Sequence, residues 1–152
     1  MKEFPSNRIN PNEAQVLELG DSVLLSKSNF DIYLPTKIYS HGWIGDPSAQ
    51  GWGIRDGYLQ TEDCNFIAVD WSVLARGDFA DVARTSVPIV GEVTGSFIDF
   101  LVEHGASLRS FHLIGFSMGA HVVAIAAKTT KMDMLPRITG AEVQTIEFHR
   151  SI

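Results

Sequence analysis

Cysteine is almost absent from this sequence: Cys64 is the only one, which excludes an intramolecular disulfide. A strand is predicted directly after it, so we expect the thiol to be a small core side chain. Positive charge is also scarce, with 12 Lys and Arg against 18 Asp and Glu and a net charge of −6. Because no basic patch is present, nucleic acid is not expected as a partner.

Long apolar runs are missing as well. The longest candidate, Ala120–Ala127, is interrupted by His121, so no transmembrane segment is predicted. The first ten residues lack the apolar stretch of a signal peptide, and no secretory signal is visible. The H-E-x-x-H, P-loop and strand-linked G-x-G-x-x-G motifs are absent too. We therefore expect no cofactor and no metal site.

The sequence does contain an alternation of buried runs and helical stretches within 152 residues, enough for one domain. Residues 1–35 are polar and turn-rich, and an irregular segment is predicted there. Strands are predicted at 37–40, 65–70, 111–115 and 137–141, with helices at 52–62, at 78–103 and after Ser117. Asp78 is expected to cap the long helix and Gly105 to end it, with Pro88 and Gly91 breaking or bending it. This alternation predicts an α/β fold whose mostly parallel sheet carries helices on both faces.

The strongest functional pattern is Gly115-Phe116-Ser117-Met118-Gly119, which follows a predicted buried strand and precedes a helix rich in Ala and Val. In that context G-x-S-x-G is typical of a nucleophile elbow, a corner that holds serine at a strained backbone angle with its hydroxyl exposed. A Cβ at either glycine is predicted to collide with the neighbouring strand or helix. The alternative interpretation is an ordinary Gly/Ser turn.

Two further motifs fall at predicted strand ends, His41-Gly42-Trp43 after one strand and Asp70-Trp71 after the next. Ligands of parallel sheets bind beyond these carboxyl ends. In an α/β-hydrolase, the oxyanion hole takes one backbone N–H from the residue after the nucleophile and one from the loop after the His-Gly strand. By position these are Met118 and Trp43. A tight turn with Trp43 packed on the core is the alternative, and it is compatible with that role.

Three segments together resemble the animal pancreatic-lipase family in order and spacing, and its arthropod phospholipase A1-like members most of all. They are residues 37–45, 65–71 and 115–122. The resemblance implies a partial α/β-hydrolase fold, with Ser117 as the catalytic nucleophile and with Trp43 and Met118 supplying the oxyanion amides. It also implies an extracellular enzyme that cleaves carboxylic esters of glycerides or phospholipids, in contact with a lipid–water interface.

The end of the chain departs from that family. After Arg-Ile-Thr-Gly the family has Leu-Asp-Pro-Ala, whose aspartate orients the catalytic histidine, whereas this chain has Ala141 followed by Glu142. Glu142 takes the position of the acid, and residues 141–152 form a divergent tail. His149 is the one histidine after Ser117 and Glu142, and a terminal tail holds an imidazole poorly. The other four histidines are interpreted as structural: His41, His104, His112 and His121.

Residues 1–152 therefore resemble a single partial lipase domain that lacks the family's late histidine, as a truncated isoform or an incomplete gene model would. Three functions stay open. The first is a carboxylic ester hydrolase of the triacylglycerol lipase or phospholipase A1 type, weakly active or inactive in this chain. The second is a catalytically dead lipase-like protein that binds lipid at an apolar rim. The third is another α/β-hydrolase esterase, against which the His-Gly-Trp and Val-Asp-Trp motifs argue.

Overall fold

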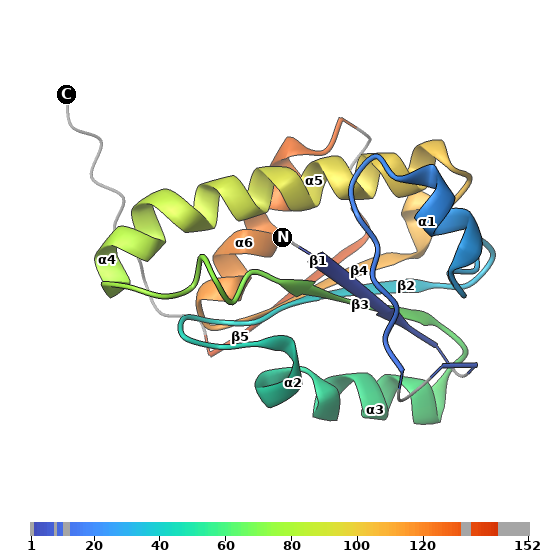
Figure 1. Cartoon of the computed structure of the whole chain (residues 1–152), viewed down its shortest axis with the longest axis horizontal. Coiled ribbons are helices and arrows are strands. Elements are labelled where there is room, and N and C mark those ends of the chain that lie inside the picture. The colour runs from blue at the N-terminus through green and yellow to red at the C-terminus, as the bar shows by residue number, and fades with distance from the viewer. Residues whose placement is uncertain (1, 8, 11–12, 132–134, 143–152) are drawn as a thin grey trace.

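The computed structural model describes residues 2–7, 9–10, 13–131 and 135–142. They contain a five-stranded sheet with helices packed on it (Figure 1). The strands are β1 (Lys2–Ser6), β2 (Thr36–Ser40), β3 (Asn65–Asp70), β4 (Phe111–Phe116) and β5 (Arg137–Ala141). Their order across the sheet is β1-β3-β2-β4-β5. Strands β3, β2, β4 and β5 run parallel, while β1 pairs antiparallel with β3. The predicted mostly parallel sheet is confirmed.

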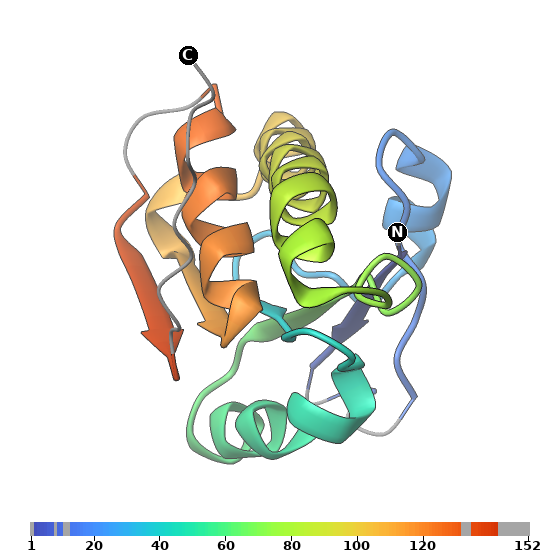
Figure 2. The ribbon, with the colours of Figure 1, turned by 90° about the vertical axis from the view of Figure 1, so that its left-hand side faces the viewer.

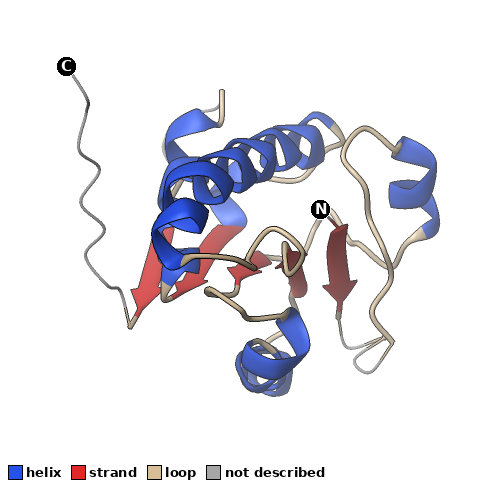
Figure 3. Ribbon diagram, turned by 60° about the vertical axis from the view of Figure 1, so that its left-hand side comes forward, coloured by secondary structure: helices blue, strands red, loops and turns tan. Residues whose placement is uncertain are grey.

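Helices cover both faces of this sheet, as predicted. Helices α5 (Val87–Glu103) and α6 (Met118–Thr129) lie over one face, and α2 (Pro47–Gln50) and α3 (Trp52–Thr61) lie over the other (Figures 1 and 2). The strands form one twisted layer between them (Figure 3). Side chains alternate along β2, so Ile38 joins the apolar cluster beneath α5 and α6, whereas Tyr39 joins the cluster on the α3 side. Every residue of β2 is buried, because the strand is covered on both faces.

The predicted long helix is one continuous rod in three parts. They are α4 (Phe79–Asp81), a π-helical turn (Val82–Ser86) and α5. Asp78 is the N-cap, and its carboxylate accepts the backbone N–H groups of Ala80 at 2.9 Å and Asp81 at 3.3 Å. Gly105, with φ of +104°, follows the last turn. Both predicted ends of the helix are therefore confirmed.

The predicted interruptions of that helix differ in their outcome. The π-helical turn ends just before the first turn of α5, which contains Pro88, a residue with no N–H to donate. Gly91, in contrast, does not break the helix. A Cβ on Gly91 would lie 2.6 Å from the Cβ of Ile125 on α6, so this glycine lets the two helices approach closely.

By length and composition, the rod Phe79–Glu103 could cross a membrane: it has 25 residues and a mean hydropathy of 1.3 in its most apolar part. No second helix in the described part of the chain meets this test. Of that apolar part, 56% is buried inside the domain, and core helices that pack on a sheet meet the test equally well. The sequence analysis predicted this helix but did not consider it as a possible membrane span, because it considered only uninterrupted apolar runs.

Two elements lie where an irregular segment was predicted for residues 1–35. All five residues of β1 pair with β3, from Lys2 opposite Asp70 to Ser6 opposite Phe66. Pro5 is tolerated in this strand because β1 lies at the edge of the sheet. Helix α1 (Ser22–Lys27) begins at Asp21, whose carboxylate accepts N–H groups at 3.0 and 2.9 Å. The predicted irregular segment is corrected in these two stretches. A further short 3₁₀ turn, Leu108–Ser110, precedes β4.

Candidate functional site

Ser117 forms the corner between β4 and α6. Its φ of 51° and ψ of −120° lie outside the regions that residues with a Cβ ordinarily occupy. The corner is held from both sides, because the Ser117 N–H donates to Ala141 O at 2.8 Å and the Ser117 carbonyl accepts from Ala120 N at 3.0 Å. A strained backbone at a half-buried serine is the geometry that the sequence predicted for an elbow.

The glycines of the motif are required by close backbone contacts. A Cβ on Gly115 would lie 2.5 Å from the backbone nitrogen of Ala120 in α6. A Cβ on Gly119 would lie 2.5 Å from the carbonyl oxygen of His41 and would overlap that of Ser40, at the end of β2. The predicted collisions, one with the helix and one with the neighbouring strand, are confirmed. Because Gly119 has no side chain, the corner and the end of β2 can lie in direct contact.

The loop after β2 lies directly beside Ser117. A Cβ on Gly42 would come within 3.0 Å of Ser117 Cβ and 3.3 Å of its Oγ. The indole Nε1 of Trp43 donates to Gly77 O at 3.1 Å, and its ring meets Phe79 edge-on at a centroid distance of 5.5 Å. The Trp43 side chain is therefore packed against its neighbours, as the tight-turn interpretation predicted. Gly42, the residue before Trp43, is the one that contacts the corner.

Strained backbone is concentrated at this rim of the sheet. Among the described residues, the non-glycine residues with positive φ are Ile44 (53°), Ser117 (51°) and Glu142 (49°). They follow β2, β4 and β5, and parallel strands bring their carboxyl ends to one edge. Such strain persists only where the surrounding structure enforces it, and it clusters at functional sites.

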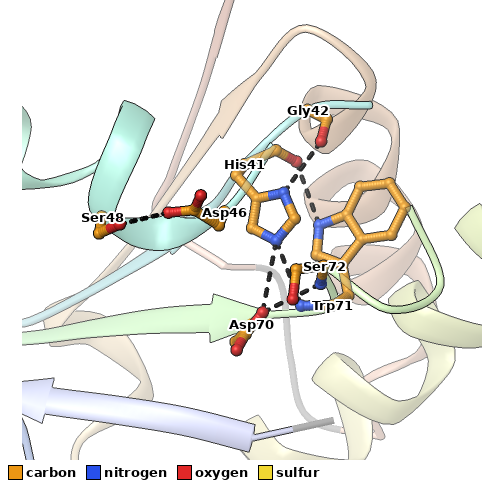
Figure 4. A network of polar contacts seen from close by, with 7 residues as sticks. All are labelled: His41, Gly42, Asp46, Ser48, Asp70, Trp71 and Ser72. Carbon is orange, nitrogen blue, oxygen red and sulfur yellow. Dashed lines mark hydrogen bonds and ion pairs between the residues drawn. The ribbon is translucent and has the colours of Figure 1, made fainter. Parts of the chain in front are cut away.

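His41 is fully buried and stacks on Trp71 at a centroid distance of 5.1 Å (Figure 4). The backbone N–H of Trp71 donates to Nε2 of His41 at 3.2 Å, and the Trp71 indole donates to the His41 carbonyl at 3.1 Å. Nδ1 of His41 contacts Gly42 O at 2.9 Å. Burial lowers the pKa of His41, against smaller raising effects of Gly42 O, Asp70 and Asp46. The ring is therefore neutral at pH 7, and the 3.9 Å from its Nε2 to Asp70 is too long for a hydrogen bond.

Two other histidines are engaged away from the corner. His104, at the end of α5, donates from Nδ1 to Phe100 O at 2.8 Å. His112 lies on the α3 side of the sheet, with Nδ1 at 3.1 Å from Tyr58 Oη and Nε2 at 2.9 Å from Thr139 Oγ1. Burial, together with weaker repulsion from Arg137 and Lys37, lowers the pKa of His112 to about 4. The sequence did not reveal the Tyr58–His112–Thr139 network, because its members are far apart along the chain.

Glu142 is exposed and directly follows Ala141, whose carbonyl accepts the Ser117 N–H. The backbone at the predicted acid position therefore adjoins the corner, while the catalytic role of its carboxylate stays a prediction. His121 lies half-buried on α6, one turn after Ser117. His149 lies outside the described residues. The oxyanion role of the Trp43 and Met118 amides also stays a prediction at this point.

Exposed apolar side chains lie in the loops after β2 and β3, at the same edge of the sheet as the corner. Ile44 is 63% exposed, Val73 82% and Leu74 41%. Their two loops are neighbours, because Ile44 N donates to Ala75 O at 3.0 Å. We call Ile44, Val73 and Leu74 the apolar rim. A hollow of about 390 Å³ opens at residues that follow β2 and at the end of β3. It is lined by Ala14, Asp46, Pro47, Ser48, Trp52 and Asp70.

Comparison with known proteins gives a consistent assignment. The chain is 35% identical over 136 residues to inactive pancreatic lipase-related protein 1 of Mus musculus, covering 88% of this chain and 28% of the relative. It is 32% identical over 136 residues to pancreatic triacylglycerol lipase of Homo sapiens, covering 88% and 28%. It is 31% identical over 143 residues to phospholipase A1 member A of Mus musculus, covering 93% and 30%.

The chain thus spans less than a third of the length of these curated relatives. The family described as Lipase matches residues 6–151, which is nearly the whole chain and includes the Ser117 corner and the loop after β2. With the mostly parallel sheet and the strained serine at its edge, this match shows that the chain belongs to the lipase family.

Proposed function

We propose that Ser117 is the nucleophile of a carboxylic ester hydrolase of the triacylglycerol lipase or phospholipase A1 type. The observation that carries this proposal is the strained Ser117 corner with Gly42 packed against its side chain. Strain at a serine that adjoins a second loop is costly, and it has a purpose when the hydroxyl must be presented to a substrate.

In the proposed reaction, Ser117 Oγ attacks the ester carbonyl carbon and its proton passes to a base. The carbonyl oxygen gains negative charge in the tetrahedral intermediate, and the alkoxide then leaves as an alcohol after it is protonated. Two backbone N–H groups, of Trp43 and Met118, stabilise that charge. Water hydrolyses the acyl-serine by the same steps and releases the fatty acid.

The backbone of both proposed donors suits this task. Met118 is the first residue of α6, and the N–H groups of a helix's first turn have no acceptor within the helix. The positive end of the helix dipole also favours an anion there. In the loop after β2, the N–H groups of Ile44 and Gly45 donate to Ala75 O and Gly42 O. Among the described residues, the N–H of Trp43 has no backbone acceptor of its own.

The apolar rim supports a lipid ester as the substrate. Its three exposed aliphatic side chains lie in the loops after β2 and β3, at the sheet edge that holds the Ser117 corner, and favour contact with acyl chains or with a lipid–water interface. An extracellular location, which the family resemblance implies, belongs to this same proposal. The family match over residues 6–151 favours a lipase over a thioesterase or a cytosolic esterase.

We expect the 152 residues alone to hydrolyse esters weakly or not at all. Glu142 is the proposed acid, but the imidazole that would take the Ser117 proton is unassigned. The rings of His41, His104 and His112 all contact groups other than Ser117. Without a base, serine keeps its proton at neutral pH and attacks slowly, so only binding and the oxyanion hole contribute.

A catalytically dead, lipid-binding lipase homologue is the second candidate function. It is favoured by the same histidine contacts and by the name of a relative, inactive pancreatic lipase-related protein 1. Such a protein would keep the apolar rim and hold an acyl chain there without cleaving it.

Turnover of a short-chain nitrophenyl ester by the purified chain and by its Ser117→Ala variant tests the proposal. A small activity that disappears in the variant supports a serine hydrolase that lacks an oriented catalytic base. Activity equal in both proteins, with fatty acid bound by both, supports the binding protein. Robust turnover that is abolished in the variant would confirm the nucleophile and overturn the expected weakness of this chain.

A further inference from the structure

The side chain of His41 contacts the peptide unit that contains the proposed oxyanion donor. Nδ1 of His41 lies 2.9 Å from the carbonyl oxygen of Gly42. That carbonyl and the N–H of Trp43 belong to one peptide plane, and no cis peptide bond occurs among the described residues. In a trans peptide the C=O and N–H groups point in opposite directions. The atom that holds the Gly42 carbonyl therefore also fixes the direction of the Trp43 N–H.

The tautomer of His41 is determined by its second nitrogen. The backbone N–H of Trp71 donates to Nε2 at 3.2 Å, so Nε2 is an acceptor and carries no proton. A neutral ring then has its proton on Nδ1, the nitrogen that faces Gly42 O (Figure 4). The stack on Trp71 and the bond from the Trp71 indole to the His41 carbonyl keep the ring from turning. His41 is thus oriented as a donor to one carbonyl.

We propose that His41 is a positioning residue of the oxyanion hole: its Nδ1–H holds the Gly42 carbonyl and so turns the Trp43 N–H toward Ser117. The inference rests on the proposed function, since the role exists only if Trp43 is an oxyanion donor. The sequence analysis interpreted the His41 ring as structural, and the proposal gives it a role in positioning the oxyanion donor. It also explains why a polar ring is fully buried beside a site whose chemistry does not need it as a base.

A second donor at Gly42 is needed because glycine constrains its own peptide little. Gly45 N donates to Gly42 O at 3.1 Å, which closes a turn, and Ile44, the third residue of that turn, has a positive φ. One bond within a strained turn allows the peptide plane to tilt. The second bond comes from the His41 ring, which is itself held by Trp71, the residue directly after β3. This bond fixes the Gly42–Trp43 peptide plane relative to the sheet.

The two carboxylates near His41 favour protonation of the ring, but burial outweighs them and lowers its pKa. Asp70 lies 3.9 Å from Nε2, and Asp46 acts from the loop after β2. The carboxylate of Asp70 accepts the N–H of Ser72 at 2.9 Å, and that of Asp46 accepts the hydroxyl of Ser48. Asp70 faces Nε2 at a distance too long for a hydrogen bond, so it does not compete with Gly42 O for the proton on Nδ1.

The test uses amide resonances of the ¹⁵N-labelled chain with phenylboronic acid as the probe. Ser117 Oγ donates a lone pair to boron and loses its proton to solvent, and boron becomes a four-coordinate anion that mimics the intermediate. In the wild type, the amide proton resonances of both Trp43 and Met118 are expected to shift downfield.

In His41→Phe, which keeps a ring against Trp71 but cannot donate, the Trp43 amide loses its shift and the Met118 amide keeps it. Boronate affinity falls about tenfold, as expected for one lost hydrogen bond to an anion. His41→Asn, whose amide can still donate to Gly42 O, regains the Trp43 shift.

The possible results distinguish the positioning role of His41 from the proposed function itself. If Trp43 shifts equally in His41→Phe and in the wild type, the positioning role is wrong and the proposed oxyanion hole stands. If neither amide shifts in the wild type, the proposed function fails and His41 has no donor to position. Should His41→Phe not fold, ring ¹⁵N resonances of the wild type decide, because a proton on Nε2 in place of Nδ1 overturns the proposal.

Discussion

Gly119 of α6 lies directly against the carbonyl oxygen of Ser40 at the end of β2, so that a Cβ on this glycine would overlap that oxygen. The contact joins the elbow to the strand that carries the Gly42 loop. We expect Gly119→Ala to lower the free energy of unfolding by about 1–3 kcal/mol, because both contacting groups are backbone and cannot rotate away. Urea denaturation measures the change.

Gly57→Ala is the matched control for that substitution. Gly57 also lies in a helix, α3, and a Cβ there would meet no atom within 4 Å. Its replacement by alanine is expected to raise the free energy of unfolding by about 0.5–1 kcal/mol, through helix propensity. Equal effects of both substitutions would show that the contact with Ser40 carries no strain.

The backbone angle of Ser117 predicts an unusual order of stabilities. Ser117→Gly is expected to be more stable than Ser117→Ala by about 1 kcal/mol, because glycine relieves the positive φ that alanine retains. Thermal and urea unfolding of the two variants measure this difference. At Ser96, an exposed position within α5, the order should reverse, with alanine more stable than glycine by about 1 kcal/mol. The same order at both sites would mean that the Ser117 corner is relaxed.

Stability should fall as the pH is lowered below about 6.5, because the folded protein lowers the pKa of His112 to about 4. Between these two values the unfolded chain binds the proton and the folded one does not, so acid favours unfolding. The histidine contributes at most about 1.4 kcal/mol per pH unit in that window. Above it, the contribution is complete and constant. Urea unfolding at pH about 5 and about 7 measures the loss.

His112→Gln tests the assignment of that pH dependence. Its loss of stability between the two pH values should be smaller than that of the wild type, because glutamine does not titrate. The residual slope includes His41, whose pKa is lowered by burial in the same direction. An unchanged slope in His112→Gln would place the acid sensitivity elsewhere.

The apolar rim predicts lipid binding that can be reduced without unfolding the domain. Val73 is 82% exposed, so Val73→Asp should leave the free energy of unfolding within about 0.5 kcal/mol. Binding to phosphatidylcholine vesicles, measured by sedimentation, should fall about tenfold because an apolar contact is replaced by a charge. Tyr33→Asp is the control, since Tyr33 is 89% exposed and precedes the amino end of β2, away from the rim. Equal losses in both variants would exclude the rim as the contact surface.

The sequence predicted the elements that bury contiguous apolar residues. Strands β3 and β4 were found because their central residues are mostly apolar, and β2 because residues 37–40 are bounded by Pro35 and by His41-Gly42. The corner was found because glycines fix its spacing. Strand β1 was missed because Lys2–Ser6 has little strand pattern of its own and is held by pairing with β3. Helix α1 was missed because it is six residues long, although Asp21 was an available N-cap signal.

The candidate site was predictable where backbone requirements leave a mark in the sequence. The collisions at Gly115 and Gly119 follow from the G-x-S-x-G spacing. The contact of His41 with Gly42 does not, because it depends on Trp71, thirty residues later, for the tautomer and the stack. Long-range contacts of this kind come only from the folded chain.

The π-helical turn Val82–Ser86 changes the helical phase of the rod that contains it. Val87 N donates to Val82 O, five residues back, so this turn holds more residues than an α-helical one. Each extra residue rotates the preceding segment by about 100° relative to an uninterrupted α-helix. The offset lets α5 direct its apolar face at the sheet while Phe79 lies edge-on against Trp43. Deleting one residue from this turn would point Phe79 away from the loop that carries the proposed oxyanion donor.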